Sequence, residues 1–303
     1  MTKHVAVLLG GLSTEREVSL VSGAAVAKTL AEEGFRVTPV DVGRDLAGVL
    51  SAVRPDVVFN ALHGRFGEDG CVQGILEILG IPYTHSGVLA SALAMHKPTA
   101  KRLFTDAGLP CAEGRVMPRE AVLSGGFTSP FVIKPLNEGS SVGVRIIFDG
   151  DNLAPLDGAN WPFGPEVLVE RYIPGREIQV AVMGDRALGA IEIRPQGRFY
   201  DYEAKYTAGR AVHLMPAPIH PDAYERALEI ARIAHQTLGC RGVSRADLRY
   251  DDTSGEPGDF YLLEINTQPG MTPLSLVPEI AADVGISFGA LVRWLVESAR
   301  CDN

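Results

Sequence analysis

The sequence predicts an α/β protein with additional α+β elements, in which an open parallel sheet is followed by two regions rich in antiparallel strands. Three observations support this fold class. Roughly the first ninety residues alternate between apolar runs and helical spacing. From about Met95, short β-rich segments are separated by Gly and Ser, and after Pro174-Gly175 a third region combines strands with a long helix. We therefore expect three units, at residues 1–94, 95–175 and 176–303.

The first unit begins with a continuous apolar run at 5–9, which is typical of a strand covered on both faces. A capping box of Thr14 and Glu17 predicts the start of the helix that follows. Further strands are expected at 36–42 and 56–62, and a helix at 69–79. Open parallel sheets bind ligands beyond the carboxyl ends of their strands, so the loops at 10–17 and 63–74 should face a site. The apolar stripe of the first helix is expected to contain Val18, Val21, Ala25 and Leu30.

The second and third units are predicted from shorter patterns. A helix at 99–107 ends at Gly108-Leu109-Pro110. The strands that follow are expected at 131–134, 144–148, 167–172 and 178–183. The third unit should hold strands at 186–193, 244–250 and 259–265, helices at 221–238 and 288–299, and a loop at 197–212.

Composition and charge exclude several classes of protein. The net charge of −9 argues against a generic nucleic-acid-binding surface. No run approaches the roughly 20 apolar residues of a membrane helix, and the apolar start is too short for a signal peptide, so no membrane partner is expected. The four cysteines form no CxxC pair. This indicates neither a zinc site nor a disulfide framework, and it favours a cytoplasmic protein.

The strongest functional pattern lies near the C-terminus. If 244–250 and 259–265 pair as strands, alternation places Arg245 and Asp247 on one face, beside Glu264 and Asn266 of the neighbouring strand. Two carboxylates and a carboxamide are hard oxygen ligands that suit Mg²⁺ bridging phosphates. Arg245 would stabilise charge on a phosphoryl oxygen or an oxyanion. The alternative is that these residues form the polar outer face of a hairpin. That interpretation explains an Arg–Asp pair, but it explains Glu264 and Asn266 less well.

A Gly/Ser loop at 135–143 follows a strand that ends in Lys134. Its backbone N–H groups and the lysine suit phosphate oxygens, although an ordinary flexible turn is equally compatible with the segment alone. The loop is not a Walker A motif, and Gly10-Gly11-Leu12 does not form GxGxxG. A dinucleotide site is therefore poorly supported.

Three further segments have both a functional and a structural interpretation. The glycines around His63 allow close approach of a ligand, but a capped loop with a hydrogen-bonded histidine explains them too. Glu15 is an acid in a first helical turn, where acids are favoured in any case. The polar and aromatic stretch at 200–206 suggests a lid, or a solvated loop.

Together these segments resemble the bacterial D-alanine–D-alanine ligases, a family of the ATP-grasp superfamily, along nearly the whole chain and in the family's order. The resemblance implies a Rossmann-like N-terminal domain followed by a two-part ATP-grasp fold that holds ATP between two β-sheets. The segments that carry it are LLGG at 8–11, EREVS at 15–19, HGRFGEDG at 63–70, KPLNEGSSVG at 134–143, YDYEAKY at 200–206, RADL at 245–248, LLEINTQPGMT at 262–272 and SLVP at 275–278.

The resemblance also implies a reaction. One D-alanine carboxylate attacks the γ-phosphate of ATP and forms an acyl phosphate, and the amine of a second D-alanine displaces the phosphate. The product is D-alanyl-D-alanine, a peptidoglycan precursor. A ligase that makes D-alanine–D-lactate, and another ATP-grasp carboxylate–amine ligase, are the alternatives within the class. A non-catalytic nucleotide-binding protein is the alternative outside it, although Arg245 and the three expected metal ligands are all present.

The family's site residues map onto this sequence as follows. Glu15, near His63, would accept the ammonium of the first D-alanine, and Ser140 and Tyr206 would bond to Glu15 and close two loops over the site. The ATP contacts would be Lys97, Lys134 and Lys205 at the phosphates and Glu170 and Glu177 at the adenine and ribose. Two Mg²⁺ ions, or Mn²⁺, would be held by Asp247, Glu264 and Asn266. The oxyanion donors would be Arg245 and the Gly270 N–H, and the second carboxylate would be anchored by Ser275 and Leu276.

Three positions depart from the family's usual residues. His96 stands where Asp often precedes the first phosphate lysine, Arg249 where an apolar residue is usual, and Gln268 where Ser is common. None of them removes a catalytic group. A homodimer is expected from the family alone.

Overall fold

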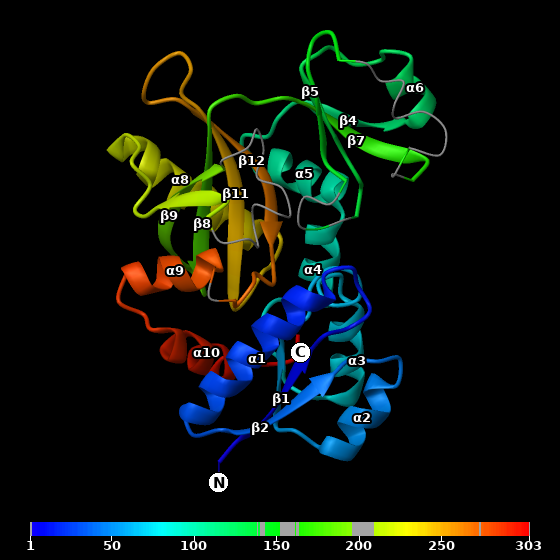
Figure 1. Cartoon of the computed structure of the whole chain (residues 1–303), viewed down its shortest axis with the longest axis vertical. Helices are drawn as coiled ribbons and strands as arrows, with labels where there is room; N and C mark the ends of the chain where they lie inside the picture. Colours follow the sequence, from blue (N-terminus) through cyan, green and yellow to red (C-terminus); the bar gives the residue numbers. More distant parts are fainter. Residues whose placement is uncertain are drawn as a thin grey trace.

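In the residues that it describes, the computed structural model contains three sheets, connected as Figure 1 shows. It describes residues 2–137, 139, 143–151, 161, 164–195, 209–272 and 274–302. One sheet is parallel and two are antiparallel, which confirms the predicted fold class. None of the helices in these ranges combines the length and the apolar character needed to cross a membrane.

The N-terminal sheet has the strand order β2-β1-β3 and is parallel throughout. Its central strand is buried on both faces, as its continuous apolar sequence predicts. The carboxyl ends of the three strands therefore lie at one edge of the sheet, where the loops after Leu9 and Asn60 begin. The elements of this part are β1 (His4–Leu9), α1 (Arg16–Glu32), β2 (Arg36–Asp41), α2 (Leu46–Val53), β3 (Val57–Asn60) and α3 (Cys71–Leu79).

The predicted start and stripe of the first helix are partly wrong. Helix α1 has Glu15 as its N-cap, without a side-chain capping bond, so Thr14 forms no capping box. The preceding turn is held instead by Ser13, whose hydroxyl accepts the Glu15 N–H and donates to the His63 carbonyl. Val21 is 52% exposed, because the buried stripe is shifted by about one residue. That stripe contains Val18, Ser19, Ser22, Gly23, Val26, Ala27 and Leu30.

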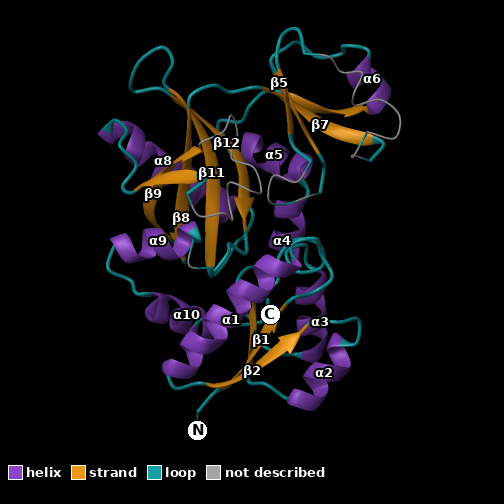
Figure 2. Ribbon diagram, in the orientation of Figure 1, coloured by secondary structure: helices purple, strands orange, loops and turns teal. Residues whose placement is uncertain are grey.

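The larger antiparallel sheet has the order β10-β9-β8-β11-β12. Helix α8 packs on one face and helices α9 and α10 lie towards the other, as Figure 2 shows. The predicted pairing of the two last strands is confirmed. The elements of this part are β8 (Arg176–Met183), β9 (Arg186–Pro195), β10 (Ala211–Leu214), α8 (Pro221–Thr237), β11 (Val243–Asp251), β12 (Asp259–Asn266), α9 (Leu276–Asp283) and α10 (Phe288–Glu297).

The smaller antiparallel sheet has the order β4-β7-β5-β6 and its own hydrophobic cluster. Two helices lead into it from the N-terminal part. Its elements, with those two helices, are α4 (Val88–Met95), α5 (Lys97–Asp106), β4 (Gly114–Pro118), α6 (Arg119–Leu123), β5 (Phe131–Lys134), β6 (Arg145–Ile147) and β7 (Glu166–Arg171).

Two hydrophobic clusters cross the predicted unit boundaries. Phe104 of α5 packs with residues of β8 and α8, so this helix belongs to the core of the larger antiparallel sheet. Leu291 and Leu295 of α10 pack with Val5 and Leu30, which belong to β1 and α1. The three units are thus joined by shared cores, and the boundaries at 94/95 and 175/176 stay predictions.

Several short elements were not predicted, among them α2, α4, α6 and α9. Each has only five to eight residues, too few for a clear period in the sequence. The helix expected at 99–107 begins two residues earlier, at Lys97, and the loop expected up to 212 ends where β10 begins at Ala211.

Candidate functional site

The polar face of β11 and β12 has the predicted arrangement. In the strand register, Arg245 lies opposite Asn266 and Asp247 lies opposite Glu264. Arg245 donates to both carboxylate oxygens of Asp247, with Nε–Oδ1 at 2.7 Å and Nη2–Oδ2 at 2.9 Å. Asp247 is only 4% exposed. A carboxylate is therefore held in a fixed orientation in the larger antiparallel sheet, next to a second one on the neighbouring strand.

A lysine of α5 neutralises the second carboxylate. Lys97 Nζ donates to Glu264 Oε2 at 2.8 Å. Burial lowers the pKa of Lys97, but the negative charge of Glu264 outweighs it and the pKa is raised, so the lysine stays charged. The backbone N–H of Lys97 also donates to the Leu136 carbonyl at 3.0 Å. Lys97 thus joins the end of β12 to the loop that follows β5.

His96 has a clear structural role where the family often has Asp. It is the N-cap of α5, and its Nδ1 accepts the Thr99 N–H at 3.3 Å. A histidine nitrogen can satisfy an orphan N–H of a helix start as an Asp oxygen does. The departure from the family's usual residue therefore leaves Lys97 at the first position of the helix.

A buried glutamate lies between two more lysines. Glu170 of β7 is 4% exposed and forms ion pairs with Lys134 of β5, at 2.5 Å, and with Lys101 of α5. Burial raises the pKa of Glu170, but the two lysines outweigh it and the pKa is lowered. Lys101 was not predicted. The available signal was its position four residues after Lys97, which places both lysines on one face of α5.

The donor set of Asp247, Glu264 and Asn266 fits a magnesium ion in chemistry. All three offer hard oxygens, and two are buried or half-buried carboxylates on neighbouring strands. The Asn266 Oδ1 accepts the Gln268 N–H at 2.8 Å, which fixes the direction of the carboxamide. In the described ranges there is no group of three or more His, Cys, Asp or Glu side chains arranged to hold a metal.

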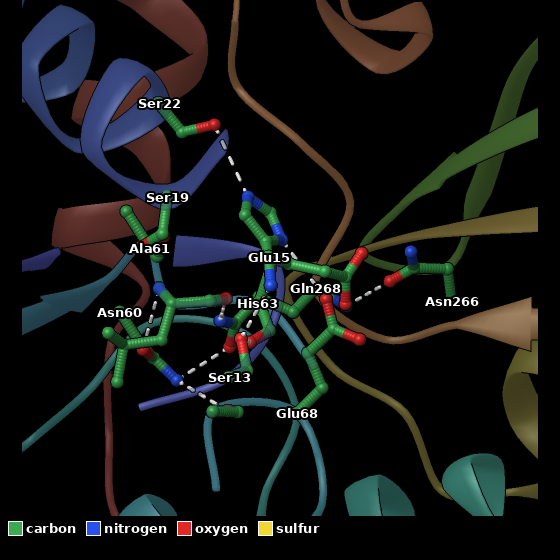
Figure 3. A network of polar contacts seen from close by, with 12 residues as sticks. Ser13, Glu15, Ser19, Ser22, Asn60, Ala61, His63, Glu68, Asn266 and Gln268 are labelled. Carbon is green, nitrogen blue, oxygen red and sulfur yellow. Dashed lines mark hydrogen bonds and ion pairs between the residues drawn. The ribbon is translucent and has the colours of Figure 1, made fainter. Parts of the chain in front are cut away.

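The loops at the carboxyl edge of the parallel sheet form a second part of the site (Figure 3). His63 Nδ1 contacts Glu68 Oε1 at 3.0 Å, and its Nε2 contacts the Ser22 hydroxyl at 3.2 Å. Glu15 is buried beside them. Gly64 has φ +65°, and a Cβ there would lie 2.5 Å from Glu15 Oε2. The glycine is therefore required for the approach of that carboxylate.

Gly139 places the loop after β5 next to the same acids. A Cβ on Gly139 would lie 3.4 Å from Glu15 Oε2 and 3.7 Å from Glu68 Oε2. Three loops from distant parts of the sequence thus meet at Glu15. The predicted partners Ser140 and Tyr206, and the predicted phosphate contact Lys205, lie outside the described residues.

The loop after β12 contains the remaining predicted residues. A Cβ on Gly270 would lie 2.8 Å from the Ser275 hydroxyl, so these two residues are adjacent. That hydroxyl accepts the Thr272 N–H at 2.9 Å. Leu276 is the first residue of α9, and its side chain is buried in the core. Only its backbone N–H, at the positive end of the helix dipole, is placed to meet an anion.

Glu177 and Arg249 lie opposite each other in the register of β8 and β11. Glu177 Oε1 accepts a hydrogen bond from Gln179 at 3.2 Å. Arg249 donates to the carbonyls of Ile173, at 3.2 Å, and Gly175, at 2.7 Å. The arginine that departs from the family's apolar residue therefore supports the connection between β7 and β8.

A cavity of about 250 Å³ lies at the carboxyl edge of the parallel sheet. It is lined by residues that follow all three strands, among them Leu12, Gly43 and His63. This is the position that the strand order predicts for a ligand.

The fold, together with the ion pairs that the lysines of α5 form with Glu264 and Glu170, defines a class of protein. Two antiparallel sheets, with the lysines of α5 between their carboxylates, are the arrangement of an ATP-grasp protein. Two family models match the chain: "D-ala D-ala ligase C-terminus" over residues 106–297 and "D-ala D-ala ligase N-terminus" over residues 47–86. The chain belongs to the D-alanine–D-alanine ligase family.

Individual relatives cover almost the whole chain. It is 59% identical to D-alanine–D-alanine ligase of Parvibaculum lavamentivorans over 303 residues, covering 99% of this chain and 98% of the relative. It is 60% identical to the same enzyme of Paramagnetospirillum magneticum, covering 100% of both. Among solved structures, D-alanine–D-alanine ligase of Bacillus anthracis complexed with ATP has a TM-score of 0.83 at 30% identity, covering 98% of this chain and 97% of the other.

A relative with another substrate has nearly the same fold. The VanG D-Ala:D-Ser ligase of Enterococcus faecalis has a TM-score of 0.79 at 30% identity, covering 98% of this chain and 99% of the other. Overall fold alone therefore does not decide the second substrate.

Proposed function

We propose that the chain is an ATP-dependent ligase that joins two D-alanines into D-alanyl-D-alanine, a peptidoglycan precursor. The observation that carries the proposal is the register of β11 and β12, which sets Arg245, Asp247, Glu264 and Asn266 side by side. The 59–60% identity to D-alanine–D-alanine ligases over nearly the full chain supports the same substrate.

In the first step, a carboxylate oxygen of the first D-alanine attacks the γ-phosphorus of ATP. The new O–P bond forms as the bond to the bridging oxygen breaks, and ADP leaves with that electron pair. Lys97 and Lys134, which form ion pairs with Glu264 and Glu170, offset the phosphate charge. Glu15 accepts the ammonium of this alanine and His63 lies beside it, which together fix its orientation.

In the second step, the free amine of another D-alanine attacks the carbonyl carbon of the acyl phosphate. The C–N bond forms, the C–O bond to phosphate breaks with its electron pair staying on the phosphate oxygen, and the proton lost by the amine nitrogen passes to the departing phosphate. Arg245 and the Gly270 N–H stabilise the oxyanion of the tetrahedral intermediate. Ser275 and the N–H of Leu276 hold the second carboxylate at the start of α9.

Two divalent ions, Mg²⁺ or Mn²⁺, would be held by Asp247, Glu264 and Asn266. When bound, they supply positive charge at the phosphate oxygens of ATP. ATP itself as the nucleotide is supported by the Bacillus anthracis complex. We further propose that Glu177 contacts the ribose and Glu170 the adenine, and that the enzyme is a cytoplasmic homodimer.

The test is phosphate release from ATP and Mg²⁺ with product identification by mass. D-alanine alone should give phosphate and D-alanyl-D-alanine in equal amounts, and L-alanine should give neither. D-alanine with D-lactate, or with D-serine, should still give mainly D-alanyl-D-alanine. A depsipeptide or D-alanyl-D-serine as the main product would keep the mechanism and overturn the second substrate. Absence of turnover with D-alanine would overturn the proposed function.

A further inference from the structure

We propose that Gln268 is a positioning residue, which holds the loop of Gly270 at a fixed distance from the loops that orient the first D-alanine. The inference rests on the proposed function. Gln268 does not touch substrate in this role. It acts through the backbone of Gly270 on one side and through Leu62 and His63 on the other.

The contacts of the Gln268 side chain cross from the end of β12 to the end of β3. Gln268 is 1% exposed. Its Oε1 accepts a hydrogen bond from Asn60 Nδ2 at 2.6 Å, and its Nε2 donates to the Leu62 carbonyl. Figure 3 shows this side chain between the two loops. Both polar atoms of the carboxamide thus form hydrogen bonds to residues about two hundred positions earlier in the chain.

Asn60 transmits this contact to the loop of His63. It is fully buried, and its Nδ2 also donates to the Gly67 carbonyl at 3.0 Å. Its Oδ1 accepts the Leu62 N–H at 3.2 Å. Asn60 therefore holds both ends of the loop 62–67, so a shift of Gln268 would be felt along the whole loop.

Gln268 and Met271, which lie on either side of Gly270 in the sequence, both form hydrogen bonds to the N-terminal part of the chain. Gln268 lies two positions before Gly270, and its own N–H donates to Asn266 Oδ1. On the other side, the Met271 N–H donates to the Ser22 hydroxyl at 3.3 Å. That hydroxyl also contacts His63 Nε2. The N–H of Gly270 is thereby fixed relative to His63 from two directions.

The spacing between Glu15 and the Gly270 N–H matters because one D-alanine molecule must contact both of them. In the proposed function, the first D-alanine places its ammonium at Glu15 and its carboxyl carbon near the Gly270 N–H, so these two groups must be held one amino-acid length apart. A misplacement of about 1 Å between such groups can cost about a hundredfold in rate. Directional hydrogen bonds of a buried carboxamide fix the spacing more narrowly than apolar packing would.

The experiment replaces Gln268 without changing the volume of the core. In Gln268→Met, the KM for D-alanine should rise by about tenfold to a hundredfold and kcat should fall. The KM for ATP should stay within about twofold, because the Asn266 bond uses the backbone N–H and the lysines are not touched. Asn60→Ala should give the same pattern, and the double variant should be no worse than the more severe single variant.

Gln73→Met is the matched control. Gln73 is equally buried and its Nε2 donates to the same Gly67 carbonyl at 2.8 Å, but its side chain forms no hydrogen bond to the described residues of 176–303. It should lower the Tm by a similar amount and leave the KM for D-alanine near the wild-type value. If both variants have the same effects on Tm and on this KM, Gln268 is only structural and the inference is overturned. If the wild-type protein forms no dipeptide, the proposed function fails, which is a separate result.

Discussion

Lys97 and Glu264, 167 positions apart in the sequence, form an ion pair of 2.8 Å at the junction of α5 and β12. The pair joins a cation suited to phosphate with a carboxylate suited to a metal ion. Each charge satisfies the other in this structure, and in the proposed function the phosphates of ATP and a divalent ion would replace both partners. An acidic protein with a net charge of −9 can thereby hold half-buried lysines ready for an anionic substrate.

The first prediction concerns this carboxylate. Glu264→Gln should lower turnover by about a hundredfold or more and raise the Mg²⁺ concentration needed for half-maximal rate. The measurement is the initial rate of phosphate release against Mg²⁺ and ATP concentration, with a thermal melt to show that the variant is folded. Glu33→Gln is the control, because Glu33 forms a comparable 2.7 Å pair with Arg293 away from the site. Near-normal ligase activity in Glu264→Gln would remove the metal assignment.

The second prediction concerns Gly64. Gly64→Ala should raise the KM for D-alanine by about tenfold or more, because the added Cβ lies 2.5 Å from Glu15 Oε2 and displaces that carboxylate. Gly80→Ala is the control, since Gly80 has the same φ of +65° and nothing within 4 Å of its added Cβ. Both variants should lose about 1–2 kcal/mol of stability from the backbone conformation. Equal KM values for D-alanine in the two variants would contradict the placement of Glu15.

The third prediction concerns the stability provided by Glu170. The pKa of its carboxyl is lower in the folded protein than its ordinary value of 4.5. Below pH 4.5 the unfolded chain therefore binds a proton that the folded protein does not, and stability falls as the pH falls. Glu170→Gln should lose about 3–5 kcal/mol near pH 7, because two half-buried lysines lose their buried partner.

Urea unfolding between pH 3.5 and pH 7 tests both statements about Glu170. The gap in unfolding free energy between the wild type and Glu170→Gln should narrow towards the acid end of this range. A gap that stays constant with pH would show that the carboxylate is not charged in the folded state.

The fourth prediction concerns a buried histidine outside the site. Burial lowers the pKa of His235 to about 4, and its Nδ1 contacts the Ser244 hydroxyl at 2.7 Å. Between pH 6.5 and about 4 the unfolded chain takes up a proton that the folded protein does not. His235 therefore lowers the free energy of unfolding by about 1.4 kcal/mol for each unit by which the pH falls in this range. His235→Gln should show a shallower loss of unfolding free energy across this range. An unchanged slope would mean that His235 is protonated in the folded protein.

Local pattern was sufficient for one part of the site and not for another. The alternation of Arg245 and Asp247, and of Glu264 and Asn266, correctly predicted that each pair shares one face of its strand, because side chains alternate with a period of two. The ion pair of Glu170 with Lys101 and the contact of Gln268 with Asn60 join residues 69 and 208 positions apart. No local period contains such information. Gln268 was visible in the sequence only as a departure from the family's usual residue.

The shared core of α10 with β1 and α1 has a consequence for synthesis of the protein. The first sheet to leave the ribosome lacks the helix that covers part of it until nearly all of the chain has been translated. During that time Val5 and Leu30, both fully buried in the finished fold, have no complete core to enter. Nascent chains stalled before α10 should therefore be captured by chaperones that recognise apolar surface.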